Sequence, residues 1–73
     1  MATITTLSIG PNKEHLGHGV EVAMEVRTSA GRFTFPFKFE DQGSTAANET
    51  QAHRELQTFL QEALQALQVL GDR

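Results

Sequence analysis

Residues 20–40, VEVAMEVRTSAGRFTFPFKFE, decide the fold of this chain. The first eight positions alternate between apolar side chains and polar or small ones, and the apolar members are Val20, Val22, Met24 and Val26. The last eight alternate in the same way, with apolar positions held by Phe33, Phe35, Phe37 and Phe39. A period of two is typical of strands that bury one face. The stretch therefore predicts two antiparallel strands, over residues 20–27 and 32–40.

The two apolar stripes also determine how these strands pair. They share a face if the numbers of paired residues sum to 59, which places Glu21 opposite Lys38 and Arg27 opposite Arg32. The first pair is attractive and the second is repulsive. We expect Glu25 to lie close enough to the two arginines to relieve their repulsion.

The connection between the strands follows from the same register. A loop of two or of four residues is compatible with it, whereas a three-residue loop would put the stripes on opposite faces. We expect the four-residue loop 28–31, because Gly31 can supply the positive φ that ends such a loop. Pro36 has no N–H to donate to a neighbour, so we expect either that the phenylalanine strand lies at an edge of the sheet or that the Pro36 nitrogen points away from any neighbouring strand.

A further strand is expected over residues 3–9, which are rich in the β-branched side chains that suit strands. Its apolar pattern is imperfect, because Ile4 faces one way and Leu7 and Ile9 face the other. A Gly-Pro pair follows residue 9, and we expect it to end the strand. The stretch 10–19 holds three glycines, which indicate a flexible loop.

The last third of the chain changes to a helical period. Its apolar positions fall within an arc of about 140° at 100° per residue, and they are Ala52, Leu56, Phe59, Leu60, Ala63, Leu64, Leu67 and Leu70. This pattern predicts a helix over residues 48–70. We expect Asn48 as its N-cap residue and Gly71 as its C-cap residue.

Composition agrees with one small globular domain. The chain has 73 residues, 38% of them hydrophobic and 21% charged, and a formal net charge of −3. It contains no cysteine, which excludes a disulfide-stapled miniprotein and a cysteine-based zinc module. We predict a single α+β domain over residues 1–73, of β-β-β-α order, with a three-stranded antiparallel sheet packed on one face by a long C-terminal amphipathic helix. Residues 1–10 have neither a basic nor a continuous apolar region, so we expect a cytoplasmic protein.

The predicted helix is too long for its sheet. At 1.5 Å per residue it measures roughly 34 Å, whereas a seven-residue strand reaches about 23 Å. The apolar stripe continues into the overhanging part, and domains of this size rarely reach more than about 3–5 kcal/mol of stability alone. We therefore expect a homodimer, with the interface at Phe35, Phe37, Leu60, Leu64, Leu67 and Leu70. The alternative is that the apolar stripes form one dense monomeric core.

Three histidines supply the sharpest chemical hypothesis. His15 and His18 lie in the glycine-containing loop, and His53 lies at the margin of the helical stripe. Zinc can take three histidines and a water, but Gly17 disfavours the helix that would bring His15 and His18 together. These three are weak metal candidates beside the simpler interpretation of solvent-facing histidines. We assign no catalytic or cofactor-binding residue.

The function that the sequence favours is a non-enzymatic interaction module. We expect an accessory or regulatory protein, acting as a homodimer, that binds another protein. The alternative is a small-ligand or metal-dependent activity centred on the loop bearing His15 and His18. A nucleic-acid partner is disfavoured, because the basic residues are scattered and matched by acidic ones. No run of apolar residues approaches the roughly 20 that a membrane span requires.

Overall fold

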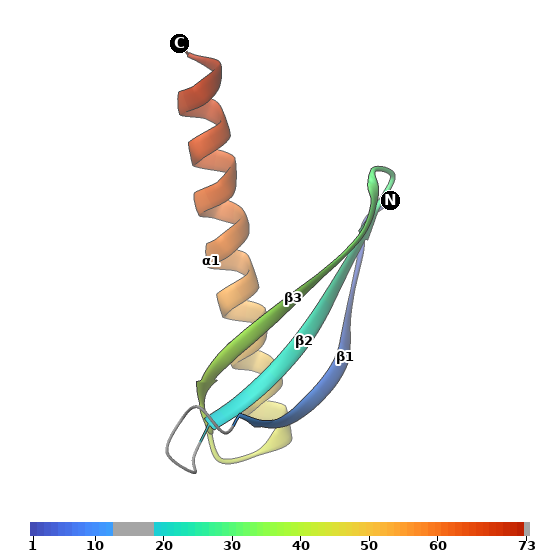
Figure 1. Ribbon diagram of the computed structural model, residues 1–73, viewed down its shortest axis with the longest axis vertical. Coiled ribbons are helices and arrows are strands. Elements are labelled where there is room, and N and C mark those ends of the chain that lie inside the picture. The colour runs from blue at the N-terminus through green and yellow to red at the C-terminus, as the bar shows by residue number, and fades with distance from the viewer. Residues whose placement is uncertain (13–18, 73) are drawn as a thin grey trace.

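The computed structural model describes residues 1–12 and 19–72. Three strands, β1 (Thr3–Asn12), β2 (Gly19–Thr28) and β3 (Gly31–Glu40), precede one helix, α1 (Thr45–Gly71). The strands form one antiparallel sheet of order β1-β2-β3, and α1 packs against one face of it (Figure 1). The predicted α+β fold of β-β-β-α order is confirmed.

The pairing of β2 with β3 follows the predicted register, with Glu21 opposite Lys38 and Arg27 opposite Arg32. The expected four-residue loop is wrong, because Thr28 and Gly31 also pair and leave a two-residue turn. The turn is accommodated by φ of +142° at Gly31, now the first residue of β3, a conformation that glycine adopts readily. The Thr28 hydroxyl accepts a hydrogen bond from the Ala30 N–H at 3.0 Å, which satisfies a turn donor.

A β-bulge in β1 resolves the imperfect pattern of that strand. The pairing shifts between Thr6 and Ser8, so that Leu7 is the extra residue. Ile4 pairs with Val26 and Ile9 with Val22, which puts both isoleucines on the same face. The expected opposite orientation is wrong, because one inserted residue reverses the parity of everything beyond it.

The first strand also runs further than expected. It continues through the Gly-Pro pair to Asn12, which is buried and pairs with Gly19. Pro11 is tolerated because β1 is an edge strand, where a missing N–H need not interrupt a ladder. The predicted position of Pro36 on an edge strand is confirmed for β3. Both edges of the sheet therefore contain a proline, which disfavours pairing with a further strand.

One face of the sheet carries the core. Its cross-strand rows run from Val20 beside Phe39 at one end, through Val22 and Met24, to Val26 beside Phe33 at the hairpin end. The buried apolar residues on this face pack with two residues from the N-terminal half of α1, and the cluster comprises Val20, Val22, Met24, Val26, Phe39, Ala52 and Leu56. The Thr6 hydroxyl donates to the Met24 sulfur at 3.4 Å, so this polar group has a partner beside the core.

The start of the helix differs from the expectation. Ser44, in extended conformation, is the N-cap residue, and its hydroxyl accepts from the Ala47 N–H at 3.1 Å. Asn48 lies one turn inside the helix and is buried. Its side-chain oxygen accepts from the Gln42 N–H at 2.7 Å, and its amide donates to Asp41 at 3.2 Å. Asn48 therefore anchors the β3–α1 connection to the helix, and the helix begins at residue 45 rather than 48.

The other end of the helix runs one residue beyond the prediction. Gly71 is the last helical residue, and Asp72 occupies the C-cap position expected for Gly71. The Asp72 N–H lies 3.2 Å from the carbonyl oxygens of both Gln68 and Val69. Such shared hydrogen bonds are common at helix termini, so no left-handed glycine is needed here.

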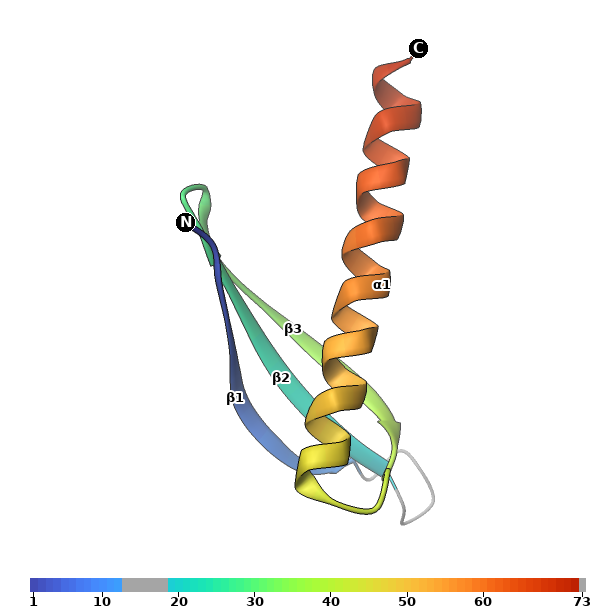
Figure 2. The ribbon, with the colours of Figure 1, turned by 180° about the vertical axis from the view of Figure 1, so that it is seen from behind.

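The sheet and the helix diverge from the end where they are joined. They meet at the β3–α1 connection and separate toward the β2–β3 hairpin and the C-terminus, in both views (Figures 1 and 2). The Cα radius of gyration is 14.1 Å, against about 11 Å for a compact domain of this length. The strands, at ten residues, extend roughly 33 Å and the helix about 40 Å. Divergence, more than the length difference expected from the sequence, leaves the end of the helix beyond the reach of the sheet.

Candidate functional site: an uncovered apolar surface

The apolar stripe of α1 is covered at one end and bare at the other. Leu56 is 2% exposed and belongs to the core. Farther along the same face, Leu64 is 57%, Leu67 64% and Leu70 62% exposed. All four of these residues are leucines, so the difference in exposure follows the distance from the sheet and not the residue type. The C-terminal half of the helix therefore presents a core-like surface without a covering layer among the described residues.

The sheet has a matching bare end. Ile4 and Phe33 flank Val26 in the row nearest the hairpin, and they are 53% and 48% exposed although they lie on the inner face. At the opposite end of that face Val20 and Phe39 are buried. Burial on the sheet thus fades in the same direction as burial on the helix.

An apolar groove opens between these two surfaces on the β1 side of α1. Its volume is about 500 Å³, and it is lined by Ile4, His53, Leu56, Gln57, Leu60, Gln61 and Leu64. All but Ile4 come from the helix, so β1 supplies one wall and the flank of α1 the other. We call this space the groove.

The β3 side of the helix is better filled. The rings of Phe35 and Phe59 lie 5.0 Å apart between centroids in a tilted arrangement, and Phe35 stacks on Phe37 at 6.4 Å. Phe35 and Phe37 are consequently half-buried within the chain itself. Of the predicted interface residues, these two contribute to the domain's own packing, whereas Leu60, Leu64, Leu67 and Leu70 are exposed.

Few charges interrupt the bare part of the helix. Glu62 is the single charged residue in the sequence from 56 to 71, and glutamines make up most of its polar positions. A like-charged surface, including a second copy of this acidic chain, would therefore meet little repulsion here.

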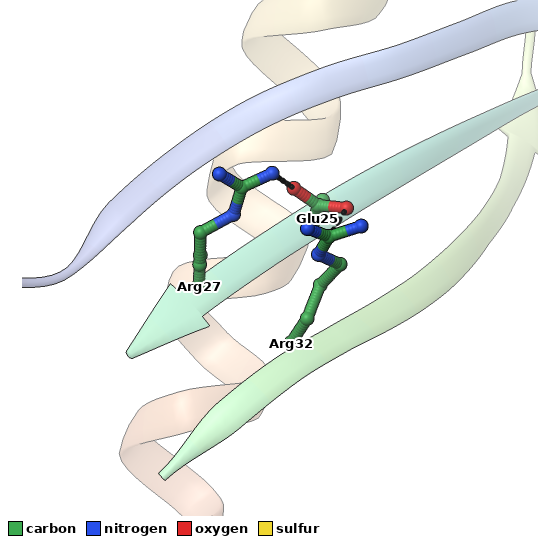
Figure 3. Close-up of polar contacts among 3 residues, drawn as sticks. All are labelled: Glu25, Arg27 and Arg32. Carbon is green, nitrogen blue, oxygen red and sulfur yellow. Dashed lines mark hydrogen bonds and ion pairs between the residues drawn. The ribbon is translucent and has the colours of Figure 1, made fainter. Parts of the chain in front are cut away.

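The outer face of the sheet is polar and carries ion pairs. Glu25 lies between two arginines on adjacent strands, 3.1 Å from Arg27 and 3.7 Å from Arg32 (Figure 3). This confirms that Glu25 lies close enough to both arginines to relieve their repulsion. The predicted attraction between Glu21 and Lys38 is also present, at 3.8 Å.

The candidate metal ligands are not assembled in the described part of the chain. His53 is exposed on α1 at the rim of the groove. His15 and His18 lie outside the described residues, so the predicted loop site stays a prediction. Within residues 1–12 and 19–72 no three histidine or carboxylate side chains are grouped as metal ligands would be.

Sequence reasoning found the leucines but missed Ile4, Phe33 and Val69 as exposed apolar residues. The Phe33 position in the stripe predicted burial, and no local signal reveals that the helix leaves the sheet before reaching it. For Ile4, the signal that could have revealed its orientation was the parity conflict with Ile9, which indicates a bulge.

Comparisons with known proteins add no assignment. No protein-family model, curated protein or solved structure matches the chain. In the part of the chain that the structure describes, α1 lacks the sustained apolar character that a bilayer-crossing helix needs.

Proposed function

We propose that this chain is a non-enzymatic interaction module, a homodimer that acts as an accessory protein by binding another protein. The observation that carries the dimer is the continuous apolar stripe of α1, buried at Leu56 and bare at Leu64, Leu67 and Leu70. An isolated chain would leave this surface in water, and burial of apolar area is the main favourable term in association.

The area available matches what a stable dimer needs. The accessible surface of the chain is 5556 Å², against about 4,450 Å² for a compact monomer of 8.0 kDa. The excess is about 1,100 Å², and a standard interface buries about 800 Å² per partner. The second copy as occupant is further supported by the low charge of residues 56–71.

The helix is favoured over the sheet edges as the dimer surface. Pro36 in β3 and Pro11 in β1 each remove an edge donor, and the bulge at Leu7 twists β1 further. Addition of a strand at either edge is therefore disfavoured. With the helices engaged in the dimer, the polar outer face of the sheet, which carries the Glu25 ion pairs, is the surface left for another protein.

A charge placed in the stripe tests this proposal. Leu67→Glu should convert the dimer, which has twice the 8.0 kDa mass of one chain, into a monomer in analytical ultracentrifugation, because an unpaired carboxylate would be buried at the interface. Gln65→Glu adds the same charge two residues away on the exposed back of α1 and should leave the dimer intact. Equal behaviour of the two variants would contradict the proposed surface.

A further inference from the structure

The bare segment of α1 is apolar around more than one face. Eight of the twelve residues from 59 to 70 are apolar. At 100° per residue they span about 220° of the helix circumference, an arc that also contains Glu62, between Val69 and Ala66. Val69, 54% exposed, accounts for the widening beyond the stripe that faces the sheet. A helix that packs against a single neighbour needs a narrower face than this. Residues 59–70 are therefore suited to contact neighbours on two sides.

The protein itself presents two such neighbours. One is the exposed helix wall around Leu60 and Leu64, and the other is the hairpin end of the sheet with Ile4 and Phe33. Both walls are apolar and about half exposed. Ile4 lines the same groove as Leu60 and Leu64, and the hairpin end of the sheet is separated from α1 by the widening angle between them (Figure 2). An inserted helix would cover both walls at once.

The location of the domain's own sheet decides the direction of the inserted helix. The sheet occupies the apolar face of α1 at Ala52 and Leu56, where the stripe is buried. A parallel second copy that followed the stripe would have to run through this sheet. An antiparallel copy overlaps only residues 59–70. Its own sheet joins it beyond the C-terminal end of the first helix, and only the hairpin end of that sheet reaches back to the overlap. Such a contact is isologous and closes with twofold symmetry.

We infer that the homodimer is interlocked. Segment 59–70 of each copy lies antiparallel to the same segment of the second copy. It is inserted between the helix of the second copy and the hairpin end of the second copy's sheet. This arrangement rests on the dimer proposed above and adds its geometry. It gives Ile4 and Phe33 the cover that their own helix does not supply, and it buries the groove.

The distance between two spin labels, one on each copy, shows whether the two helices run parallel or antiparallel. The chain has no cysteine, so Thr50→Cys gives a single attachment point for a nitroxide on the exposed part of α1. Residue 50 lies fifteen positions before the centre of the overlap, so antiparallel helices place the two labels about 45 Å apart. Parallel helices, whose axes pack about 8–10 Å apart, place them below about 30 Å. Pulsed electron spin resonance distinguishes the two, and the shorter distance in a dimer would overturn the inference while leaving the dimer standing.

A pair of adjacent substitutions tests contact with the sheet. Ile4→Glu places a charge on the inner wall and should weaken dimerisation roughly tenfold or more, although Ile4 is half exposed in the single chain. Thr3→Glu places the same charge on the outer face, opposite Arg27, and should leave the dimer unchanged. If the Ile4 variant dimerises like wild type, the second copy does not touch the sheet and the interlocked arrangement is wrong. A wild-type chain that is monomeric would overturn both this arrangement and the proposed function.

Discussion

Two single truncations on the apolar stripe of α1, Leu56→Ala and Leu67→Ala, distinguish a self-contained monomeric domain from a dimer. Leu56 is 2% exposed and lies in the core with Met24 and Val22. Leu56→Ala should lower the free energy of unfolding by about 2–5 kcal/mol, through lost burial and the cavity left behind. A domain of this size has about 3–5 kcal/mol in total, so this variant should be largely unfolded.

The unfolding free energy lost in Leu67→Ala depends on whether the chain is a monomer or a dimer. In a lone chain the side chain is 64% exposed, so its truncation removes only about a third of the burial of a core leucine and costs about 0.5 kcal/mol. If a second copy covers Leu67, the cost per chain rises to about 2 kcal/mol or more, as for a core position.

Urea unfolding followed by circular dichroism, at two protein concentrations a hundredfold apart, makes the measurement. A dimer unfolds at a midpoint that rises with protein concentration, whereas a monomer does not. We expect a midpoint that rises with protein concentration in wild type, and in Leu67→Ala a midpoint that is lowered at both concentrations by more than the loss calculated for a lone chain. If Leu67→Ala loses only about 0.5 kcal/mol of unfolding free energy, and the loss is the same at both protein concentrations, the reasoning is refuted.

Three further substitutions test the architecture by the same unfolding assay. Glu25→Gln should cost about 1 kcal/mol, with less effect in high salt, because it leaves Arg27 and Arg32 facing each other on an exposed sheet; no loss at low salt would mean that the cluster is not stabilising. Asn48→Ala should cost about 1–3 kcal/mol by leaving the Gln42 N–H without its partner, and a neutral result would contradict its anchoring role. Gly31→Ala should cost about 1 kcal/mol or more, because alanine is strained at the φ of +142° that Gly31 adopts. The added methyl group contributes little to this cost, because it would meet only an ordinary contact at 3.6 Å. A stabilised variant would contradict the turn geometry.

The secondary structure of β2, β3 and α1 was readable because each of them has its own unbroken period, whereas the bulge breaks the period of β1. The alternation in residues 20–40 determined the register of β2 and β3, including the position of Glu25 beside two arginines. The ends of the strands and of the helix were harder to predict from the sequence. Ser44 and Asn48 are both good capping residues, and the choice between them depends on where the β3–α1 connection places the helix, which is a tertiary effect.

The candidate surface was predictable in its residues but not in its shape. The spacing of Leu60, Leu64, Leu67 and Leu70 showed that an apolar stripe outlasts the sheet. The participation of Ile4 and Phe33 depends on the divergence of α1 from the sheet, and no periodic pattern encodes that angle.

The mass of the wild-type chain in solution tests the central claim most directly. Light scattering on a sizing column, over a dilution series, should give twice the 8.0 kDa mass of one chain. Persistence of that doubled mass on dilution would show that the bare leucine stripe is covered by a second copy. The mass of a single chain at every concentration would contradict the account.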